Sequence, residues 1–513
     1  MKIHLIGICG TAMATLAAML RHKGHDVVGS DQDVYPPMSD YLASEGIAVS
    51  TGYRPEHITG DVELVVVGNA ISRGNPELES VLDRKIRYCS LPEAIRDTFL
   101  WGSRSIVIAG THGKTTTTAL TAWLLADAGL DPSLLVGGIA RNFGDNGSSY
   151  RLGQGRDFVI EGDEYDSAFF DKTAKFLKYL PDIAVVNNVE FDHADIYADL
   201  GAVTLAFRRL VNLVPRSGLL LVGADSEGAR ALLSGAVSPV QTFGTRDGFE
   251  WQAHDVRTDG GGTEFQLRRL GSPFGAFRVP LVGLHNVRNA TAAIAVAAHL
   301  GVGAERIARG LEAFRGVKRR LEVVGVAGGV TVYDDFAHHP TAVAETLAGL
   351  RAANPGARIW AVFEPRSASS CRRVFQDEFA RSFAAAHQVL IAPVFRSTLP
   401  EAERLSIPQL IRDLSAQSQA ARDARSLDDI VSTIARERRD GDIVVLMSNG
   451  GFGGIHQKLL GALGGQVPGS RFSVPGSGFK NQEPGTENPE PRTRNREPRT
   501  ENREPGTGNR EPE

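Results

Sequence analysis

The stretch IVIAGTHGKTTTTAL, residues 106–120, constrains the fold of this chain more than any other. An apolar run ends in a glycine-containing turn, and small and apolar residues follow it. This is the pattern of a strand, a tight turn and the start of a helix. Backbone N–H groups of such a turn lie at the positive end of the helix, where they bind phosphate. The stretch therefore predicts a phosphate-binding loop within an α/β fold.

The loop is shorter than the full G-x-x-x-x-G-K-[ST] pattern, because Ile108 stands where that pattern requires glycine. A shortened loop can still bind phosphate if Gly110 makes the first tight turn. Lys114 would then reach the β- and γ-phosphates of a nucleotide, and Thr115 would place its hydroxyl on Mg²⁺. The alternative is a strand–helix turn that contains Gly-Lys-Thr and binds nothing.

Two acidic clusters follow the loop, each at the end of an apolar run. A magnesium nucleotide site needs carboxylate or imidazole ligands from neighbouring strands. The carboxyl ends of parallel strands converge on one crevice, so both clusters are expected near the loop. A solvated strand end is the alternative for either cluster alone. The clusters comprise Glu161, Asp163 and Glu164, and then Glu190, Asp192, His193 and Asp195.

The alternation of strand-like and helix-like segments predicts a parallel sheet with crossover helices, repeated three times. A chain of 513 residues is too long for one core. We expect three consecutive α/β domains at 1–104, 105–316 and 317–465: Rossmann-like, P-loop ATPase-like and Rossmann-like. The charged, turn-rich segment 96–105 is expected to lead from the first domain into the second. A more β-like stretch is expected at about 240–282.

The remaining residues, 466–513, repeat N-x-E-P every seven residues. Proline in each repeat blocks a helix, and no apolar positions support a coiled coil. We expect a disordered tail there.

Composition favours a globular protein and argues against several other classes. Apolar residues make up 42% and charged residues 23%, as in ordinary globular proteins. The net charge of −4, with no basic block before residue 466, argues against nucleic acid as a partner. Three cysteines cannot build a disulfide framework, which favours a reducing cytoplasm. No apolar run is long enough for a membrane span, and the N-terminus lacks signal-peptide features.

Further candidate sites lie in the outer domains. GICGTAM departs from G-x-G-x-x-G, since Cys9 and Ala12 replace two glycines, so a dinucleotide site is weakly supported and a single diphosphate remains open. In YDDFAHHP, the adjacent His338 and His339 cannot easily face one metal from a regular element. We favour ribose, phosphate or substrate contacts there over zinc. Arg366 follows a strand and suits a carboxylate, with a surface arginine as the alternative.

Together the motifs GTHGKTTTT, EGDEYD, NNVEFDHADIY, GLHNVRNATAAIAVA, RRLE and DDFAHHPT resemble the Mur ligase family, in the same order and across residues 1–462. That family uses ATP to phosphorylate a carboxylate, which an amine then attacks to form an amide. Its three domains bind a UDP-sugar, ATP and an amino acid or peptide. The resemblance implies ATP and Mg²⁺ as cofactors and a role in cell-wall peptidoglycan.

Residue roles carried over from the resemblance fall into four sets. The expected catalytic residues are Lys114, Glu161 and His193. The expected ATP-binding residues are Gly110, Thr111, His112, Gly113, Lys114, Thr115, Thr116, Asn286, Arg320 and Asp335. The expected magnesium ligands are Thr115, Glu161 and His193, with Glu164 a neighbour. The expected substrate-binding residues are Gly7, Gly10, Asp31, His339, Arg366 and Asn449.

Within the family, SDQDVYPPMS, GNAISRGNPE, EYDSAFFDK, FEPRS and MSNGGFGGIHQKLL are most similar to the branch that acts in murein recycling. That branch joins the peptide L-alanyl-γ-D-glutamyl-meso-diaminopimelate to UDP-N-acetylmuramate. The alternative is the branch that adds free L-alanine. We expect a cytoplasmic monomer or weak homodimer, with neither nucleic acid nor membrane as a partner. Several relatives carry a carbamylated lysine after the histidine, where this chain has Phe207 and Arg208, which puts only the geometry of a second metal in doubt.

Overall fold

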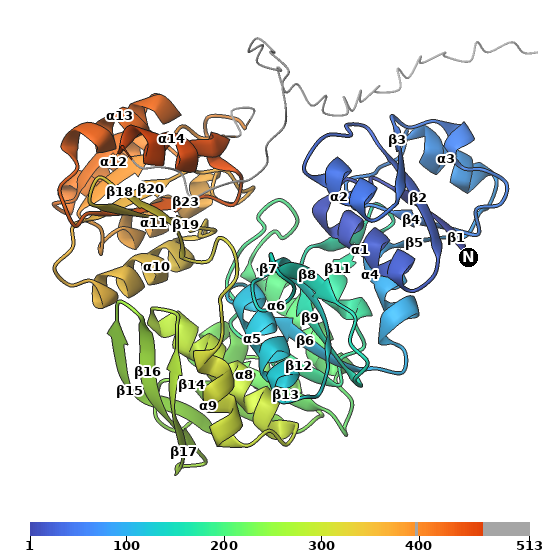
Figure 1. The fold of residues 1–513 in the computed structure, drawn as a ribbon, viewed down its shortest axis with the longest axis horizontal. Coiled ribbons are helices and arrows are strands. Elements are labelled where there is room, and N and C mark those ends of the chain that lie inside the picture. The colour runs from blue at the N-terminus through green and yellow to red at the C-terminus, as the bar shows by residue number, and fades with distance from the viewer. Residues whose placement is uncertain (396–398, 465–513) are drawn as a thin grey trace, which may run out of the picture. The chain divides into compact units, whose positions relative to one another are not determined.

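The computed structural model describes residues 1–395 and 399–464. The tail predicted at 466–513 lies outside the described residues. Three large sheets follow one another along the chain, drawn in blue, in cyan to yellow-green, and in yellow to orange-red in Figure 1. The expectation of three consecutive α/β regions is confirmed. The domain boundaries expected after residues 104 and 316 stay predictions about how the chain divides into folding units.

The first sheet is parallel throughout and has the order β3-β2-β1-β4-β5. Alternate side chains of β1 enter different cores, because neighbouring residues of a strand face opposite sides of the sheet. Ile3 and Leu5 pack in one core and Ile6 in the other. The elements are β1 (Lys2–Ile6), α1 (Thr11–His22), β2 (Asp26–Asp31), α2 (Met38–Ser44), β3 (Ala48–Thr51), η1 (Pro55–His57), β4 (Leu64–Val67), α3 (Pro76–Asp83) and β5 (Tyr88–Ser90).

The segment that joins the first and second sheets is helical where the sequence predicted a turn-rich linker, so that expectation is wrong for residues 96–100. A capping box at Ser90 starts α4 (Leu91–Ile95), and a π-helical turn, η2 (Arg96–Leu100), continues it. Phe99 and Leu100 are buried, and the Phe99 ring lies 6.4 Å from that of Phe158. Burial of these two apolar residues holds a helical turn in a charged stretch.

The second sheet has ten strands in the order β17-β16-β15-β14-β13-β12-β6-β9-β7-β8. Its strands from β15 to β7 are parallel, and antiparallel pairs flank them. The strands are β6 (Arg104–Ala109), β7 (Ser133–Ala140), β8 (Ser148–Arg151), β9 (Asp157–Gly162), β12 (Ile183–Val186), β13 (Leu219–Gly223), β14 (Val240–Gly244), β15 (Trp251–Asp259), β16 (Gly262–Arg269) and β17 (Ser272–Val279). A separate hairpin pairs β10 (Asp166–Ala168) with β11 (Asp171–Ala174).

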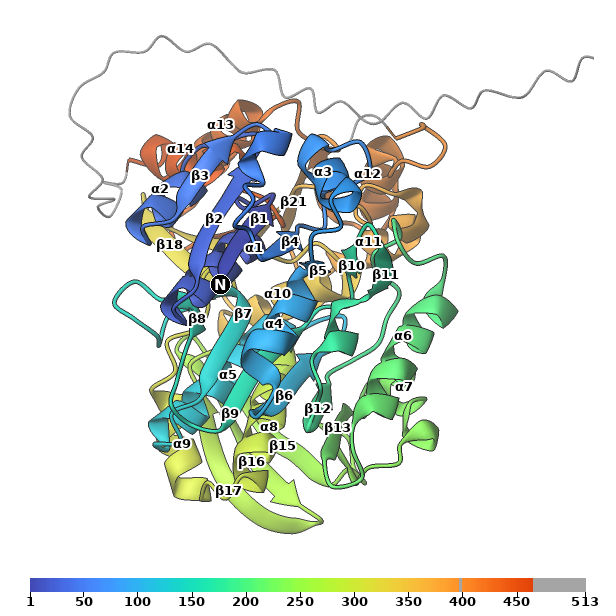
Figure 2. The ribbon, with the colours of Figure 1, turned by 90° about the vertical axis from the view of Figure 1, so that its right-hand side faces the viewer.

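Helices cover both faces of this second sheet. Val107 of β6 packs with α6 (Leu200–Leu213) in one core, whereas Ile106 and Ile108 pack with α5 (Lys114–Asp127) and α8 (Leu284–His299) in the other (Figure 2). The central strand is therefore apolar on both faces, as in other buried parallel strands. The shorter elements are η3 (Lys175–Lys178), α7 (Glu227–Arg230), η4 (Leu233–Gly235) and α9 (Ala304–Glu312).

The third sheet has the order β18-β19-β23-β20-β21-β22 and is parallel apart from the β18–β19 pair. Its strands are β18 (Glu322–Ala327), β19 (Val330–Asp335), β20 (Ile359–Phe363), β21 (Gln388–Ile391), β22 (Ala420–Asp423) and β23 (Ile443–Met447). Its helices are α10 (Pro340–Ala353), η5 (Arg373–Phe375), α11 (Gln376–Ser382), α12 (Ile407–Ala416), α13 (Leu427–Glu437), η6 (Phe452–Gly454) and α14 (Ile455–Ala462).

No helix in the described part of the chain is both long enough and apolar enough to cross a membrane.

Candidate active site

The predicted phosphate loop lies between β6 and α5, at the carboxyl edge of the second sheet. Gly110 has a φ of 136° and Gly113 a φ of 78°, so both adopt backbone conformations that favour glycine. A side chain at Gly113 would meet Asn289 Oδ1 at 2.3 Å. Glycine at these two positions lets the chain turn directly into α5, whose first residues line the cavity described below.

Lys114 is held at the carboxyl edge of the sheet by an acidic partner. Its Nζ donates to the carbonyl oxygen of Gly110 at 2.8 Å and lies 2.8 Å from Glu164 Oε2. Burial alone lowers the pKa of Lys114, but the carboxylates of Glu164, Asp163 and Glu161 together raise it above its ordinary value. The side chain is therefore a fixed positive charge beside the loop.

Thr115, Glu161 and Arg320 form a second polar group at the start of α5. The Thr115 hydroxyl donates to Glu161 Oε1 at 3.1 Å and accepts from an Arg320 N–H at 3.0 Å. Glu161 also accepts from the Gly137 N–H at 2.8 Å. Burial raises the pKa of Glu161, although Lys114 acts to lower it. A hydroxyl and a carboxylate at this spacing fit a hard cation such as Mg²⁺, which prefers oxygen ligands.

His193, the third expected magnesium ligand, is paired with Glu164 in this structure. Its Nε2 lies 3.0 Å from Glu164 Oε1, and its ring stands edge-on to Tyr165. Burial lowers the pKa of His193, but the hydrogen bond to Glu164 and the charges of Glu164 and Asp192 together raise it, so the net shift is upward. Glu164 thus joins the loop lysine to the second acidic cluster, a central position that the sequence motif alone did not reveal.

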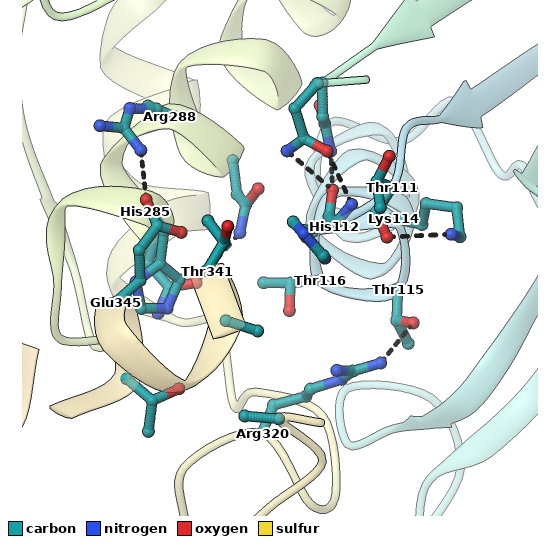
Figure 3. Close-up of a pocket in the computed structure, with 18 of the residues that line it drawn as sticks. Thr111, His112, Lys114, Thr115, Thr116, His285, Arg288, Arg320, Thr341 and Glu345 are labelled. Carbon is teal, nitrogen blue, oxygen red and sulfur yellow. Dashed lines mark hydrogen bonds and ion pairs between the residues drawn. The ribbon is translucent and has the colours of Figure 1, made fainter. Parts of the chain in front are cut away.

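A cavity of about 510 Å³, a size suited to a nucleotide, is lined by these groups other than Glu164: Lys114, Thr115, Glu161, His193 and Arg320. Figure 3 shows Lys114, Thr115 and Arg320 on one side of it and His285, Arg288 and Glu345 on the other. His285 Nδ1 is buried without a hydrogen-bond partner among the described residues, and burial lowers the pKa of this histidine. An unpaired buried nitrogen is a ready contact for a bound base.

Two residues expected to bind ATP line this cavity but already have partners within the chain. Asn286 donates to the Val282 carbonyl at 2.9 Å and accepts from Asn289 at 3.1 Å. Asp335 accepts from the N–H groups of Leu321, 2.7 Å, and Ala337, 2.9 Å. The Asp335 carboxylate therefore orders the chain around Arg320, whose guanidinium lies over the Phe336 ring.

An ionic bridge that the sequence did not reveal lies along one side of the cavity. Arg288 of α8 donates to Asp225 Oδ2 at 2.9 Å and to Glu345 Oε1 of α10 at 2.6 Å. Asp225 also accepts from the Thr245 N–H and hydroxyl. Of these residues only Arg288 falls within a motif quoted above, GLHNVRNATAAIAVA, so the bridge is revealed only by their three-dimensional placement.

A second cavity of about 320 Å³ contains Arg366 and Asn449. The Arg366 guanidinium lies over the Phe395 ring, 3.7 Å from its centroid, and Asn449 Oδ1 is buried without a hydrogen-bond partner among the described residues. Asp192, His193 and His338 line both cavities. The two cavities therefore meet at this group, a relation that sequence spacing could not establish.

The remaining predicted substrate residues line neither cavity. Gly7 and Gly10 form the turn after β1, and Asp31 organises it by accepting from the Cys9 N–H at 2.8 Å. His339 precedes α10, accepts from the Thr341 N–H at 3.3 Å and packs against His112. Gly7, Gly10 and Asp31 therefore belong to the first sheet region, which is expected to bind the UDP-sugar. His339 lies beside the phosphate loop.

Comparison with known proteins defines the class to which this fold and these sites belong. Residues 2–99 match the Mur ligase family, catalytic domain; residues 108–297 match the Mur ligase middle domain; and residues 319–450 match the Mur ligase, glutamate ligase domain. The chain belongs to the Mur ligase family, whose members are ATP-dependent ligases that form amide bonds.

Individual members of the family can be compared with this chain. The chain is 41% identical to the UDP-N-acetylmuramate–L-alanyl-γ-D-glutamyl-meso-2,6-diaminoheptanedioate ligase of Escherichia coli K12, over 90% of this chain and 98% of the relative. It is 38% identical to the UDP-N-acetylmuramate–L-alanine ligase of Agrobacterium fabrum, over 87% and 94%. The crystal structure of a murein peptide ligase from Psychrobacter arcticus is similar, with a TM-score of 0.67, 38% identity, and coverage of 91% and 99%.

Proposed function

We propose that this protein joins L-alanyl-γ-D-glutamyl-meso-diaminopimelate to UDP-N-acetylmuramate at the expense of ATP, as a cytoplasmic step of peptidoglycan recycling. The observation that carries the proposal is the contact between the two cavities at Asp192, His193 and His338. A carboxylate activated in the nucleotide cavity would be within reach of an amine in the second cavity. The acceptor is proposed from the 41% identity to the E. coli relative named for this peptide.

The reaction has two steps, and both balance within the proposed substrates. An oxygen of the muramyl carboxylate attacks the γ-phosphorus of ATP, and the bond from that phosphorus to ADP breaks. The amine nitrogen of the peptide then attacks the acyl carbon, the carbon–oxygen bond to phosphate breaks, and the nitrogen loses a proton. Phosphoryl transfer of this kind depends on positioning and on neutralising charge.

The phosphate loop residues 110–116 would hold the nucleotide phosphates, with Lys114 neutralising charge as it moves toward ADP. Thr115, Glu161 and His193 would hold Mg²⁺, which when bound supplies further neutralisation of phosphate charge. In this arrangement Glu164 is a positioning residue, because it fixes both Lys114 Nζ and His193 Nε2.

The other proposed contacts surround these groups. We assign Arg320 to the phosphates and Asn286 and Asp335 to the nucleoside, the last of them partly through its hold on residues 321–337. Arg366 and Asn449 would receive the carboxylate and amide groups of the peptide, because a guanidinium stacked on an aromatic ring keeps its N–H edge available. Gly7, Gly10 and Asp31 would bind the uridine diphosphate, and His339 would support the nucleotide side.

An acceptor comparison tests this function. Purified protein is supplied with ATP, Mg²⁺ and UDP-N-acetylmuramate, and with either the tripeptide or L-alanine, while phosphate release and product mass are followed. We expect the tripeptide to be used far better. Equal or faster turnover with L-alanine would instead support the alanine-adding branch, and no turnover with either acceptor would contradict a ligase of this kind.

A further inference from the structure

Three side chains from distant parts of the sequence meet beside the phosphate loop. His112 lies within the loop, Glu190 follows β12, and His339 precedes α10. His112 Nε2 lies 3.3 Å from Glu190 Oε2, and His339 Nδ1 lies 3.7 Å from the same oxygen. One possible ligand atom from each residue lies within 4.8 Å of the other two. This trio is separate from the Thr115–Glu161 pair that fits Mg²⁺.

The surrounding hydrogen bonds fix the His339 ring and the Glu190 carboxylate. His339 Nε2 lies 3.1 Å from the Phe191 carbonyl oxygen, so it carries the proton. His339 Nδ1 lies 3.7 Å from Glu190 Oε2 and accepts from the Thr341 N–H at 3.3 Å, a long hydrogen bond that a bound ion would replace. The Thr341 hydroxyl donates to Glu190 Oε2 at 2.6 Å and fixes the carboxylate. Metal-binding histidines commonly donate their other ring N–H to a backbone carbonyl, and metal-binding carboxylates are themselves hydrogen-bonded. Both features are present here.

The spacing suits a small tetrahedral ion. Bonds of about 2.0–2.2 Å to zinc imply distances of roughly 3.4 Å between neighbouring ligand atoms. The two distances to Glu190 Oε2 are close to this value, and the centroids of the His112 and His339 rings lie 4.6 Å apart. Two imidazoles and one carboxylate favour zinc and similar ions over Mg²⁺, which prefers oxygen ligands.

The proposed ion site can be reached from the nucleotide cavity. The Glu190 side chain is 32% exposed and lines the nucleotide cavity, so a fourth ligand position is open to solvent or to a phosphate oxygen. The simple alternative is an ion pair between His112 and Glu190, with His339 acting only as a cap for α10.

We propose that His112, Glu190 and His339 form a binding site for a first-row transition cation of the Zn²⁺ class. The bound ion joins the phosphate loop to the first turn of α10 and so links the second and third sheet regions. The adjacent His338 and His339 were not expected to share a metal. The structure instead brings His339 close to His112 and Glu190, which lie 227 and 149 positions earlier in the sequence.

Calorimetric titration of the full-length protein with ZnCl₂ tests the site, in excess Mg²⁺ and without nucleotide. We expect one equivalent to bind. Glu190→Gln and His339→Asn should each weaken binding by at least about tenfold, the scale on which metal sites respond to altered ligand surroundings. His339→Asn keeps a side-chain acceptor at the start of α10, so the helix cap is preserved.

Matched variants of the proposed magnesium site distinguish the two locations. Glu161→Gln and His193→Asn should leave zinc affinity within about threefold of the parent. If these changes abolish binding while Glu190→Gln and His339→Asn do not, zinc occupies the magnesium site and the proposal is wrong. Absence of saturable binding by the parent protein would overturn it as well.

A measurement on the unmodified protein removes any dependence on how the variants fold. With one equivalent of Cu²⁺, electron paramagnetic resonance counts the nitrogen ligands through their hyperfine coupling. The trio predicts two imidazole nitrogens, whereas Thr115, Glu161 and His193 can supply only one. A spectrum with one nitrogen or none would contradict the assignment.

Discussion

At the scale of single residues, the ammonium group of Lys114 is already positioned for the proposed phosphoryl transfer. Its ammonium group is held by the Gly110 carbonyl and by Glu164, so it needs little rearrangement to meet phosphates at the loop. Glu164 offsets the energetic cost of burying this charge. Because the same carboxylate also orients His193, the lysine and the proposed metal ligand are coupled through one side chain.

Replacing Lys114 with alanine should lower turnover by about 10²–10³-fold or more, the scale seen when a preorganised charge-stabilising group is lost. UDP-N-acetylmuramate binding should change little, because its proposed site lies in the first sheet region. A phosphate-release assay and calorimetric titration with the UDP-sugar measure these two effects. Lys458→Ala, on the exposed face of α14, is the control for loss of a lysine. Near-normal turnover of Lys114→Ala would mean that the loop is only a strand–helix turn.

Gly450 offers a sharper test of the second cavity. An added methyl group there would lie 2.1 Å from Arg366 Nε, so Gly450→Ala should push this flexible side chain off the Phe395 ring. We expect KM for the tripeptide to rise about tenfold or more, on the scale of a lost charged hydrogen bond, while KM for ATP stays nearly constant. Gly451→Ala is a matched control, since nothing lies within 4 Å of its added methyl group. Equal effects of the two changes on peptide KM would contradict the role of Arg366.

At the scale of elements, Glu77 shows how one buried charge fixes the first sheet. This carboxylate on α3 accepts from Ser30 of β2 and lies 3.2 Å from His4 Nε2 of β1 and 2.6 Å from His57 Nδ1 of η1. Burial raises the pKa of Glu77, but these three partners lower it to below its ordinary value. One side chain therefore ties together four elements.

Glu77→Gln should lower the free energy of unfolding by about 1–3 kcal/mol, because buried donors lose a charged acceptor. Since the folded-state pKa is depressed, this stabilisation is present at pH 7 and is lost as pH falls below the ordinary value of about 4.3. Calorimetric melting at pH 7 and pH 4 should therefore show a smaller difference between parent and variant at the lower pH. Glu79→Gln on the partly exposed face of α3 is the control. A pH-independent difference would contradict the assigned origin.

The elements also show where sequence reasoning succeeds and where it stops. The apolar run ending at Gly110 and the helix starting at Lys114 could be predicted because local periodicity and glycine placement determine them. Residues 96–100 could not, since a helical turn in a charged segment depends on Phe99 and Leu100 packing against a distant core. The link between Arg288 and Glu345 likewise exists only after folding brings α8 and α10 together.

At the scale of the whole molecule, residues that bind one proposed substrate come from different sheet regions. Arg320, which precedes the third sheet, donates to Thr115 in the second, and Thr341 of α10 donates to Glu190. Motif recognition supplied most of the individual residues, because each lies within a short segment that resembles the family. Their pairing across regions could not be read from the sequence, because it depends on how two separate sheets meet.

The repeat segment allows a simple test of how much of the chain the activity needs. Residues 466–513 lie outside the described residues, and their composition offers little apolar surface to offset the entropy of ordering. Ending the chain after residue 465 should leave turnover and melting temperature nearly unchanged, as measured by phosphate release and calorimetry. A large fall in either would show that this segment contributes to the folded enzyme.

The proposed reaction requires that phosphorylation activates the muramyl carboxylate before the peptide amine attacks it. This is tested directly with UDP-N-acetylmuramate that carries ¹⁸O at both oxygens of that carboxylate, in the presence of ATP, Mg²⁺ and the tripeptide. The released phosphate, examined by mass spectrometry, should carry one ¹⁸O atom for each amide formed, because the acyl carbon–oxygen bond breaks in the second step. Unlabelled phosphate, or ¹⁸O recovered in AMP, would contradict the proposed chemistry.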